Sequence, residues 1–126
     1  MNADINFLKN YIPRDELSNL LASTKGEEGE FFLELLAETE QKIRAVPPLY
    51  ANEEIGLDAP IRLHYFGGGI DFYISELDPE TGEAFGIGSI FEKELGALSI
   101  SEIVATNRLE LDLYWDDKTT LKEILN

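Results

Sequence analysis

The sequence predicts an α+β fold, in which N-terminal helices pack on a small antiparallel sheet of about five strands with a short inserted helix. Two patterns indicate this class. Apolar residues recur at every third or fourth position up to about Val46, as in amphipathic helices, and at every second position from Ile61, as in half-buried strands. A chain of 126 residues has the size of one domain, so we expect a single domain with a helical part, 1–46, and a β-rich part, 47–126.

The first part of the chain predicts two helices. Pro13 suits the first turn of a helix over about 14–22, and Gly26 favours its end because glycine readily takes the left-handed conformation. A longer helix is expected over about 27–45, and Pro47 ends it. The apolar face of this longer helix is made by Phe32, Leu35, Leu36, Thr39, Ile43 and Val46.

The middle of the chain alternates apolar and polar residues, with turn signals between the runs. Short strands are therefore predicted over 61–65, 70–77, 83–91 and 96–99, joined at Gly67–Gly69 and Asp78–Gly82 by turns. Within the third strand, Gly86 and Gly88 indicate a bulge or the close approach of another backbone.

The C-terminal part predicts a short helix, a last strand and a final helical turn. Capping-box patterns at Ser99–Glu102 and Thr120–Glu123 predict the two helix starts. Between them, 109–115 alternates as a half-buried strand does. We expect an inward face of Leu109, Leu111, Leu113 and Trp115, and an outward face of Glu110, Asp112 and Tyr114.

The charge of the chain limits its partners. There are 25 Asp and Glu residues against 10 Lys and Arg, which gives a formal net charge of −15. Such a surface repels nucleic acids and anionic membranes and attracts cationic proteins. We therefore expect a basic protein partner, no direct contact with nucleic acid and no membrane association. The N-terminal residues do not have the pattern of a signal peptide, so a cytoplasmic location is expected.

No motif predicts catalysis, and we expect neither an enzyme nor a cofactor or metal site. The chain lacks cysteine, which excludes thiol catalysis and zinc–thiolate sites. His64 is the only histidine, and no Gly-x-Ser-x-Gly nucleophile motif accompanies it, so we predict that it is dispensable for activity. The Gly67–Gly69 run is not followed by the Lys of a phosphate-binding loop. In the predicted strand 70–77, Asp71 and Glu76 are expected on opposite faces because their separation is odd.

The most acidic part of the chain is the β-rich part, and its acids are the candidates for a binding surface. Residues 47–126 carry sixteen acidic and five basic side chains, whereas residues 1–46 carry nine and five. Two tyrosines can supply the aromatic anchors that interfaces favour. The predicted partner-binding residues are Asp71, Tyr73, Glu76, Asp78, Glu80, Glu83, Glu110, Asp112, Tyr114, Asp116 and Asp117.

The last two thirds of the chain resemble a known family. The residues that carry the resemblance are Val46–Tyr50, Leu63–Phe66, Asp71–Asp78, Ala84–Gly86, Glu94–Ile103 and Leu111–Trp115. In this order they resemble domain-of-unknown-function family 2958, whose members are small acidic proteins of bacterial plasmids, prophages and conjugative elements. The resemblance implies a genetic context rather than a mechanism, because the family has no established activity and no catalytic residues to carry over.

These observations favour a non-enzymatic acidic binding protein of a mobile genetic element. It would engage or inhibit a basic, nucleic-acid-binding host protein by presenting carboxylates in place of phosphates, as a nucleic-acid mimic of the anti-defence type, for example anti-CRISPR or anti-restriction. Two alternatives stay open: an accessory protein of plasmid or phage DNA metabolism, and a small-molecule binder or enzyme with a pocket near His64. A continuous acidic ridge would favour mimicry, and a pocket around His64 would favour an enzyme.

Overall fold

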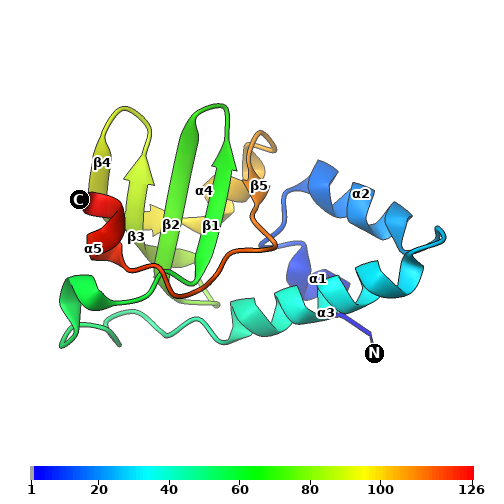
Figure 1. Cartoon of the computed structure of the whole chain (residues 1–126), viewed down its shortest axis with the longest axis horizontal. Helices are drawn as coiled ribbons and strands as arrows, with labels where there is room; N and C mark the ends of the chain where they lie inside the picture. The colour runs from blue at the N-terminus through cyan, green and yellow to red at the C-terminus, as the bar shows by residue number, and fades with distance from the viewer. Residues whose placement is uncertain (1) are drawn as a thin grey trace.

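A five-stranded antiparallel sheet has a short helix behind it and the C-terminal segment in front of it, and the N-terminal helices lie beside and below the sheet in this view (Figure 1). The computed structural model describes residues 2–126. The strands, in the spatial order β4-β3-β2-β1-β5, are β1 (Leu63–Gly67), β2 (Ile70–Leu77), β3 (Glu83–Ser89), β4 (Lys93–Ser99) and β5 (Glu110–Leu111). The helices are α1 (Ile5–Leu8), α2 (Arg14–Ser23), α3 (Gly29–Arg44), α4 (Ile100–Ala105) and α5 (Leu121–Leu125), with a short 3-10 turn, η1 (Gly56–Asp58). The predicted α+β class is confirmed.

The larger part of the core lies between helices α1 to α4 and one face of the sheet. Tyr65 of β1 is fully buried there, and its hydroxyl donates a hydrogen bond of 2.6 Å to the backbone oxygen of Tyr11. The apolar face predicted for the longer helix is the one that packs, and α2 adds a buried face of its own. Buried members from these helices include Leu17, Leu20, Leu35, Leu36 and Ile43. This burial of apolar area is the main force that attaches the helices to the sheet.

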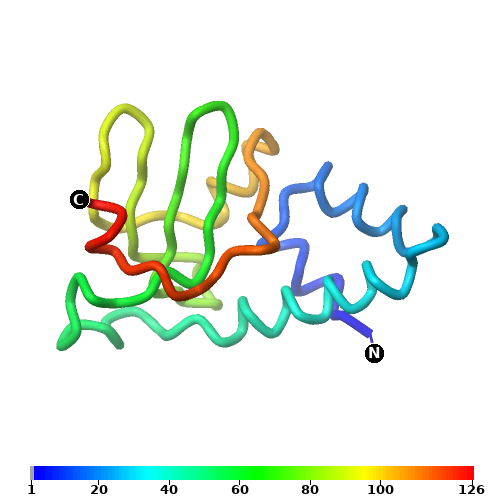
Figure 2. Tube along the Cα trace, in the orientation of Figure 1, coloured from blue at the N-terminus to red at the C-terminus, as the bar shows by residue number. Residues whose placement is uncertain are grey.

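A smaller apolar cluster covers the opposite face of the sheet. Ala59, Ile61, Ile87 and Leu121 are fully buried in it, and half-buried aromatic side chains pack around them. Helix α5 brings Leu121 to this cluster and begins with the predicted capping box of Thr120 and Glu123. The chain trace places the C-terminal helix beside η1 (Figure 2).

Glycines set two features of the sheet. Gly68 and Gly69 form a two-residue turn between β1 and β2 with φ values of 56° and 81°, as the right-handed twist of a hairpin favours. At Gly86, a Cβ would stand 1.8 Å from the backbone oxygen of Tyr73, so the predicted close approach of another backbone is confirmed. The bulge itself lies on the facing strand, where the β2–β3 register shifts between Ile74 and Glu76.

The predicted strand over 109–115 is wrong beyond its first half. Only Glu110 and Leu111 pair with β1, because Asp112 begins a turn in which its Oδ1 accepts a 3.1 Å hydrogen bond from the N–H of Tyr114. Trp115 is half-buried on the smaller cluster rather than inside the larger core, and its Nε1 donates to the backbone oxygen of Ile61 at 2.8 Å. The sequence analysis also missed α1, and it placed the start of β4 three residues too late.

Glu16 of α2 ties the helical part to β5 and makes stability depend on pH. Its Oε1 accepts a 2.7 Å hydrogen bond from the N–H of Leu111. Burial raises the pKa of Glu16 to about 7, and the nearby Glu110 and Asp112 add to the rise, whereas the hydrogen bond opposes it. Between pH 4.5 and 7 the folded protein therefore retains a proton that the unfolded chain has lost, and stability falls as pH rises.

We expect Glu16→Gln to remove this loss of stability with rising pH. The amide oxygen can still accept from Leu111, and nothing is left to ionise, so the variant should be more stable than the parent by about 1–2 kcal/mol above pH 7 after allowance for solvent screening. The two proteins should converge near pH 4.5. Urea unfolding across this pH range measures the difference, with Glu34→Gln on the exposed side of α3 as the control. Parallel pH profiles for Glu16→Gln and the parent would contradict the assignment.

Candidate binding groove

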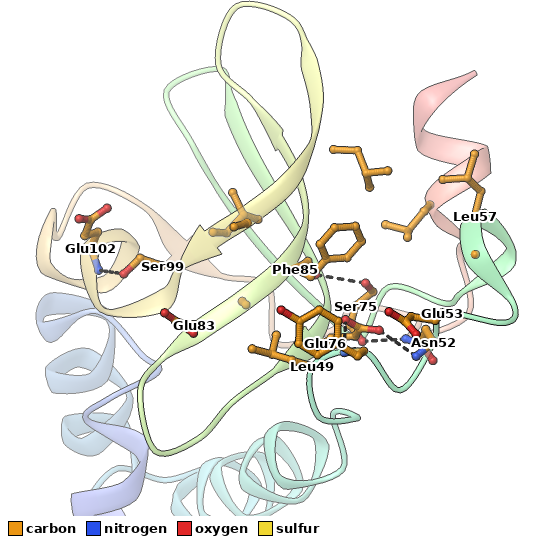
Figure 3. A pocket seen from close by; sticks show the side chains of 17 residues that line it. Leu49, Asn52, Glu53, Leu57, Ser75, Glu76, Glu83, Phe85, Ser99 and Glu102 are labelled. Carbon is orange, nitrogen blue, oxygen red and sulfur yellow. Dashed lines mark hydrogen bonds between the residues drawn. The ribbon is translucent and has the colours of Figure 1, made fainter.

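A groove of about 860 Å³ lies on the sheet face that carries the smaller cluster. Its floor is formed by β3 and β4, one wall by residues 49–57, and its ends by α4 and α5. Figure 3 shows Phe85 and Glu76 near the middle, with Glu83 and Glu102 toward one end and Leu57 toward the other. The apolar lining residues are Leu49, Leu57, Ala84, Phe85, Leu95, Ala97, Leu98 and Leu121.

Glu76 builds the wall of this groove. It is only 5% exposed, and its two carboxylate oxygens accept hydrogen bonds from the N–H groups of Tyr50, at 2.9 Å, and Asn52, at 2.8 Å. The Asn52 side chain in turn donates to the backbone oxygen of Ser75. Tyr50 has a φ of 71°, which is unfavourable for a residue with a side chain. The carboxylate therefore stabilises a strained turn that follows Pro48 and fixes the wall.

The bulge in β2 decides on which face Glu76 lies. Tyr73 pairs with Ile87, and Glu76 pairs with Phe85, which is two residues from Ile87 on the same strand. Paired residues, and residues two apart on a strand, share a face of a sheet. Because Asp71 is two residues from Tyr73, it shares that face with Glu76. The prediction that Asp71 and Glu76 point to opposite faces is wrong, since the inserted residue reverses the alternation.

The groove is apolar with a carboxylate edge. Its charged lining residues are Glu53, Glu76, Glu83 and Glu102, and no Lys, Arg or His lines it. Tyr50, which is 73% exposed, stands at its opening. The hydroxyls of Ser75 and Ser99 are used within the fold, the first donating to Phe85 O and the second accepting from Glu102 N–H. This lining suits binding of an apolar, positively charged group.

The structure gathers three of the predicted partner-binding residues around His64. Its Nε2 lies 2.8 Å from Asp71 Oδ1, its Nδ1 lies 3.1 Å from Asp112 Oδ2, and its ring stacks on Tyr73 with centroids 4.8 Å apart. Trp115 packs against the same ring at 4.9 Å. Asp112, expected on an outward face, is half-buried, and its side chain joins the turn after β5 to β1. The cluster lies beside the groove, and His64 does not line it.

The other predicted residues are spread over several places. The prediction that Glu76 belongs to an acidic surface is wrong, because this side chain is buried and both its carboxylate oxygens accept hydrogen bonds within the fold. Asp78 and Glu80 lie in the β2–β3 turn, Glu83 lines the groove, and Glu110 is exposed on β5. Tyr114 is exposed, and Asp117 lies in the segment before α5 with a φ of 54°. Asp116 caps that segment, and hydrogen bonds from Lys118 N–H, Thr119 N–H and the Thr119 hydroxyl lower its pKa.

Two features are absent from residues 2–126, a cluster of metal ligands and a helix that could cross a membrane. Within this range no group of three or more His, Asp or Glu side chains is arranged to hold a metal ion. Asp71 and Asp112 meet opposite nitrogens of His64, so their oxygens do not converge. None of the described helices has both the length and the apolar character that crossing a membrane requires.

Sequence reasoning missed most of the groove. Residues such as Leu57, Phe85 and Leu95 read as ordinary apolar positions, and only their tertiary placement joins them. Glu83 and Glu102 carried no signal beyond their charge. Glu76 was singled out for the wrong reason, and only the structure shows that it is one of four consecutive buried residues at the end of β2.

Comparisons with protein-family models, with curated proteins and with solved structures found no match to this chain. The resemblance to domain-of-unknown-function family 2958 therefore stays a prediction, and the functional argument rests on the groove.

Proposed function

We propose that the protein is a non-enzymatic acidic binding protein whose groove engages a basic protein partner. The observation that carries this proposal is the combination of an apolar lining with carboxylates as its only charged groups. A nucleic acid is a poor ligand for such a surface, because its phosphates would be repelled and no basic side chain lines the groove. A protein segment with apolar and Lys or Arg side chains satisfies both features.

The proposed partner is a host protein that itself binds nucleic acid. Such proteins present clustered Arg and Lys side chains, which carboxylates can bind by the same charge-assisted hydrogen bonds that phosphates accept. The net charge of −15 adds attraction beyond the groove. The mobile-element context implied by the family resemblance agrees with an inhibitor of a host defence or DNA-processing protein, acting in the cytoplasm.

Partner binding should weaken strongly with salt. The partner captured from a bacterial extract on the immobilised protein would be purified, and its dissociation constant measured at about 50 mM and about 500 mM salt. We expect a loss of about tenfold or more, together with displacement of the protein by duplex DNA. An affinity that does not change with salt would rule out an electrostatic mode of recognition.

A charge-matched pair of variants tests the groove. The groove variant carries Glu53→Gln, Glu83→Gln and Glu102→Gln. The helical variant carries Glu27→Gln, Glu34→Gln and Glu38→Gln. Each variant changes the net charge of the protein from −15 to −12. All six side chains are exposed, so both triple variants should fold. We expect the groove variant to lose about tenfold or more in affinity and the helical variant to lose only a few fold. Equal losses would assign recognition to net charge alone.

A cationic, apolar small molecule is the second candidate ligand. The groove volume of about 860 Å³ is that of many small-molecule sites. Thermal unfolding with a panel of hydrophobic amines tests this alternative, and stabilisation that is abolished in the triple groove variant would favour it over a protein partner.

A further inference from the structure

Strand β4 is an open edge of the sheet beside the groove. It stands at the end of the strand order and pairs with β3 alone among the described strands. About half of the backbone N–H and C=O groups of an edge strand face away from the sheet and remain available to another chain. The strand begins with Lys93 and Glu94, but the following Leu95–Leu98 carries no charge to discourage pairing. A Cβ at Gly96 would meet no atom within 4 Å, so this stretch is open to close approach.

The side chains of β4 continue the groove toward this edge. Leu95 and Ala97 line the groove, and Leu95 is 43% exposed. Neighbouring strands lie about 4.8 Å apart, so one face of a strand added at β4 would place its side chains next to these two residues. Phe91, at the turn before β4, is 100% exposed and extends the apolar surface along the same edge.

The carboxylates of the groove determine which side chains an added strand should carry. Glu83 and Glu102 stand toward one end of the groove (Figure 3), and Glu53 belongs to its opposite wall. On the one face of the added strand that meets the groove, apolar side chains in the middle would contact the floor, and Lys or Arg side chains toward the ends would reach these carboxylates. A second copy of this chain fits poorly, because it brings its own net charge of −15.

We propose that the partner binds by adding an extended segment to the free edge of β4, in which apolar residues at every second position are flanked on the same face by Lys or Arg. This inference rests on the proposed function and specifies its mode: main-chain hydrogen bonds give the added strand its register, and the acidic apolar groove selects its side chains.

Synthetic peptides of about seven residues test this mode, since that is a common strand length. The first probe is Lys-Thr-Val-Thr-Val-Thr-Lys, whose Lys and Val side chains share one face of a strand. The second, Lys-Val-Thr-Thr-Thr-Val-Lys, has the same composition but its Lys and Val side chains on opposite faces, and the third is oligolysine. Amide chemical shifts of the ¹⁵N-labelled protein report both the affinity and the place of binding. We expect the first peptide to bind about tenfold more tightly than the other two, with the largest shifts at Leu95–Leu98.

Two matched substitutions separate the edge from general electrostatics. Leu95→Lys and Leu33→Lys each add one positive charge at a leucine of similar exposure, 43% on β4 and 41% on α3. Leu95→Lys should weaken binding of the first peptide by about tenfold, because it repels the Lys side chains on the groove face and removes the apolar contact, whereas Leu33→Lys should change the affinity by less than about twofold.

Other results would overturn the inference. Equal binding of the three peptides, or shifts scattered away from β4, would show that strand addition is wrong while leaving a salt-dependent basic partner in place. A dimer formed through β4, detected by sedimentation and abolished in Leu95→Lys, would assign the edge to a second copy. Failure of all three cationic peptides to bind at millimolar concentration would overturn the inference, and a salt-independent partner would separately overturn the proposed function.

Discussion

Glu76→Ala is expected to destabilise the protein by about 3–5 kcal/mol. The substitution leaves the N–H groups of Tyr50 and Asn52 without their acceptor, and hydrogen bonds to a charged group contribute about 1.5–3 kcal/mol each. The turn also loses the hydrogen bond that holds Tyr50 in its unfavourable left-handed backbone conformation. Urea unfolding gives the size of the effect, and faster hydrogen exchange at Tyr50 and Asn52 identifies its cause.

Glu83→Ala is the matched control for Glu76→Ala. Both residues line the groove and both substitutions remove one negative charge, but Glu83 is exposed and should change stability by no more than about 0.5 kcal/mol. Glu76→Gln should fall between the two, because its amide keeps one acceptor and sets an NH₂ group against a backbone N–H. Equal stability of the two alanine variants would show that the wall of the groove does not depend on Glu76.

His64→Ala is expected to cost about 2–4 kcal/mol of stability. It removes a ring that packs on Tyr73 and Trp115, and it leaves the carboxylates of Asp71 and Asp112 facing a cavity without their shared partner. The dispensability of His64 for activity stays a prediction, but its loss should not be neutral for the fold. Thermal and urea unfolding measure the cost.

A double-mutant comparison separates the charge effect from the packing effect of His64. In a background of Asp71→Asn with Asp112→Asn, no carboxylate is left unpaired, so His64→Ala should cost about 1 kcal/mol less than in the parent protein. The same cost in both backgrounds would assign the whole effect to packing. A negligible cost in the parent would contradict the contacts of the cluster.

Local patterns determined the class of this fold. The helical stripe from Phe32 to Val46, the strand over 70–77 and the helix starts at Ser99 and Thr120 each depend on residues within one element, and each is present in the structure. The glycine turn at Gly68 is local in the same way, because the backbone of a two-residue hairpin requires positive φ angles.

The candidate groove was decided by tertiary structure alone. Alternation predicted that Asp71 and Glu76 point to opposite faces, but the bulge after Ile74 depends on pairing with β3 and moved Glu76 onto the face of Asp71. The Asp112 side chain meets His64, 48 residues away, and this contact also depends on the pairing of β5 with β1. The sequence by itself determined the α+β class and an acidity that favours basic partners. The positions of the carboxylates in space depend on contacts between distant segments. The charge of a side chain is set by the residue type, whereas its neighbours are set by the fold.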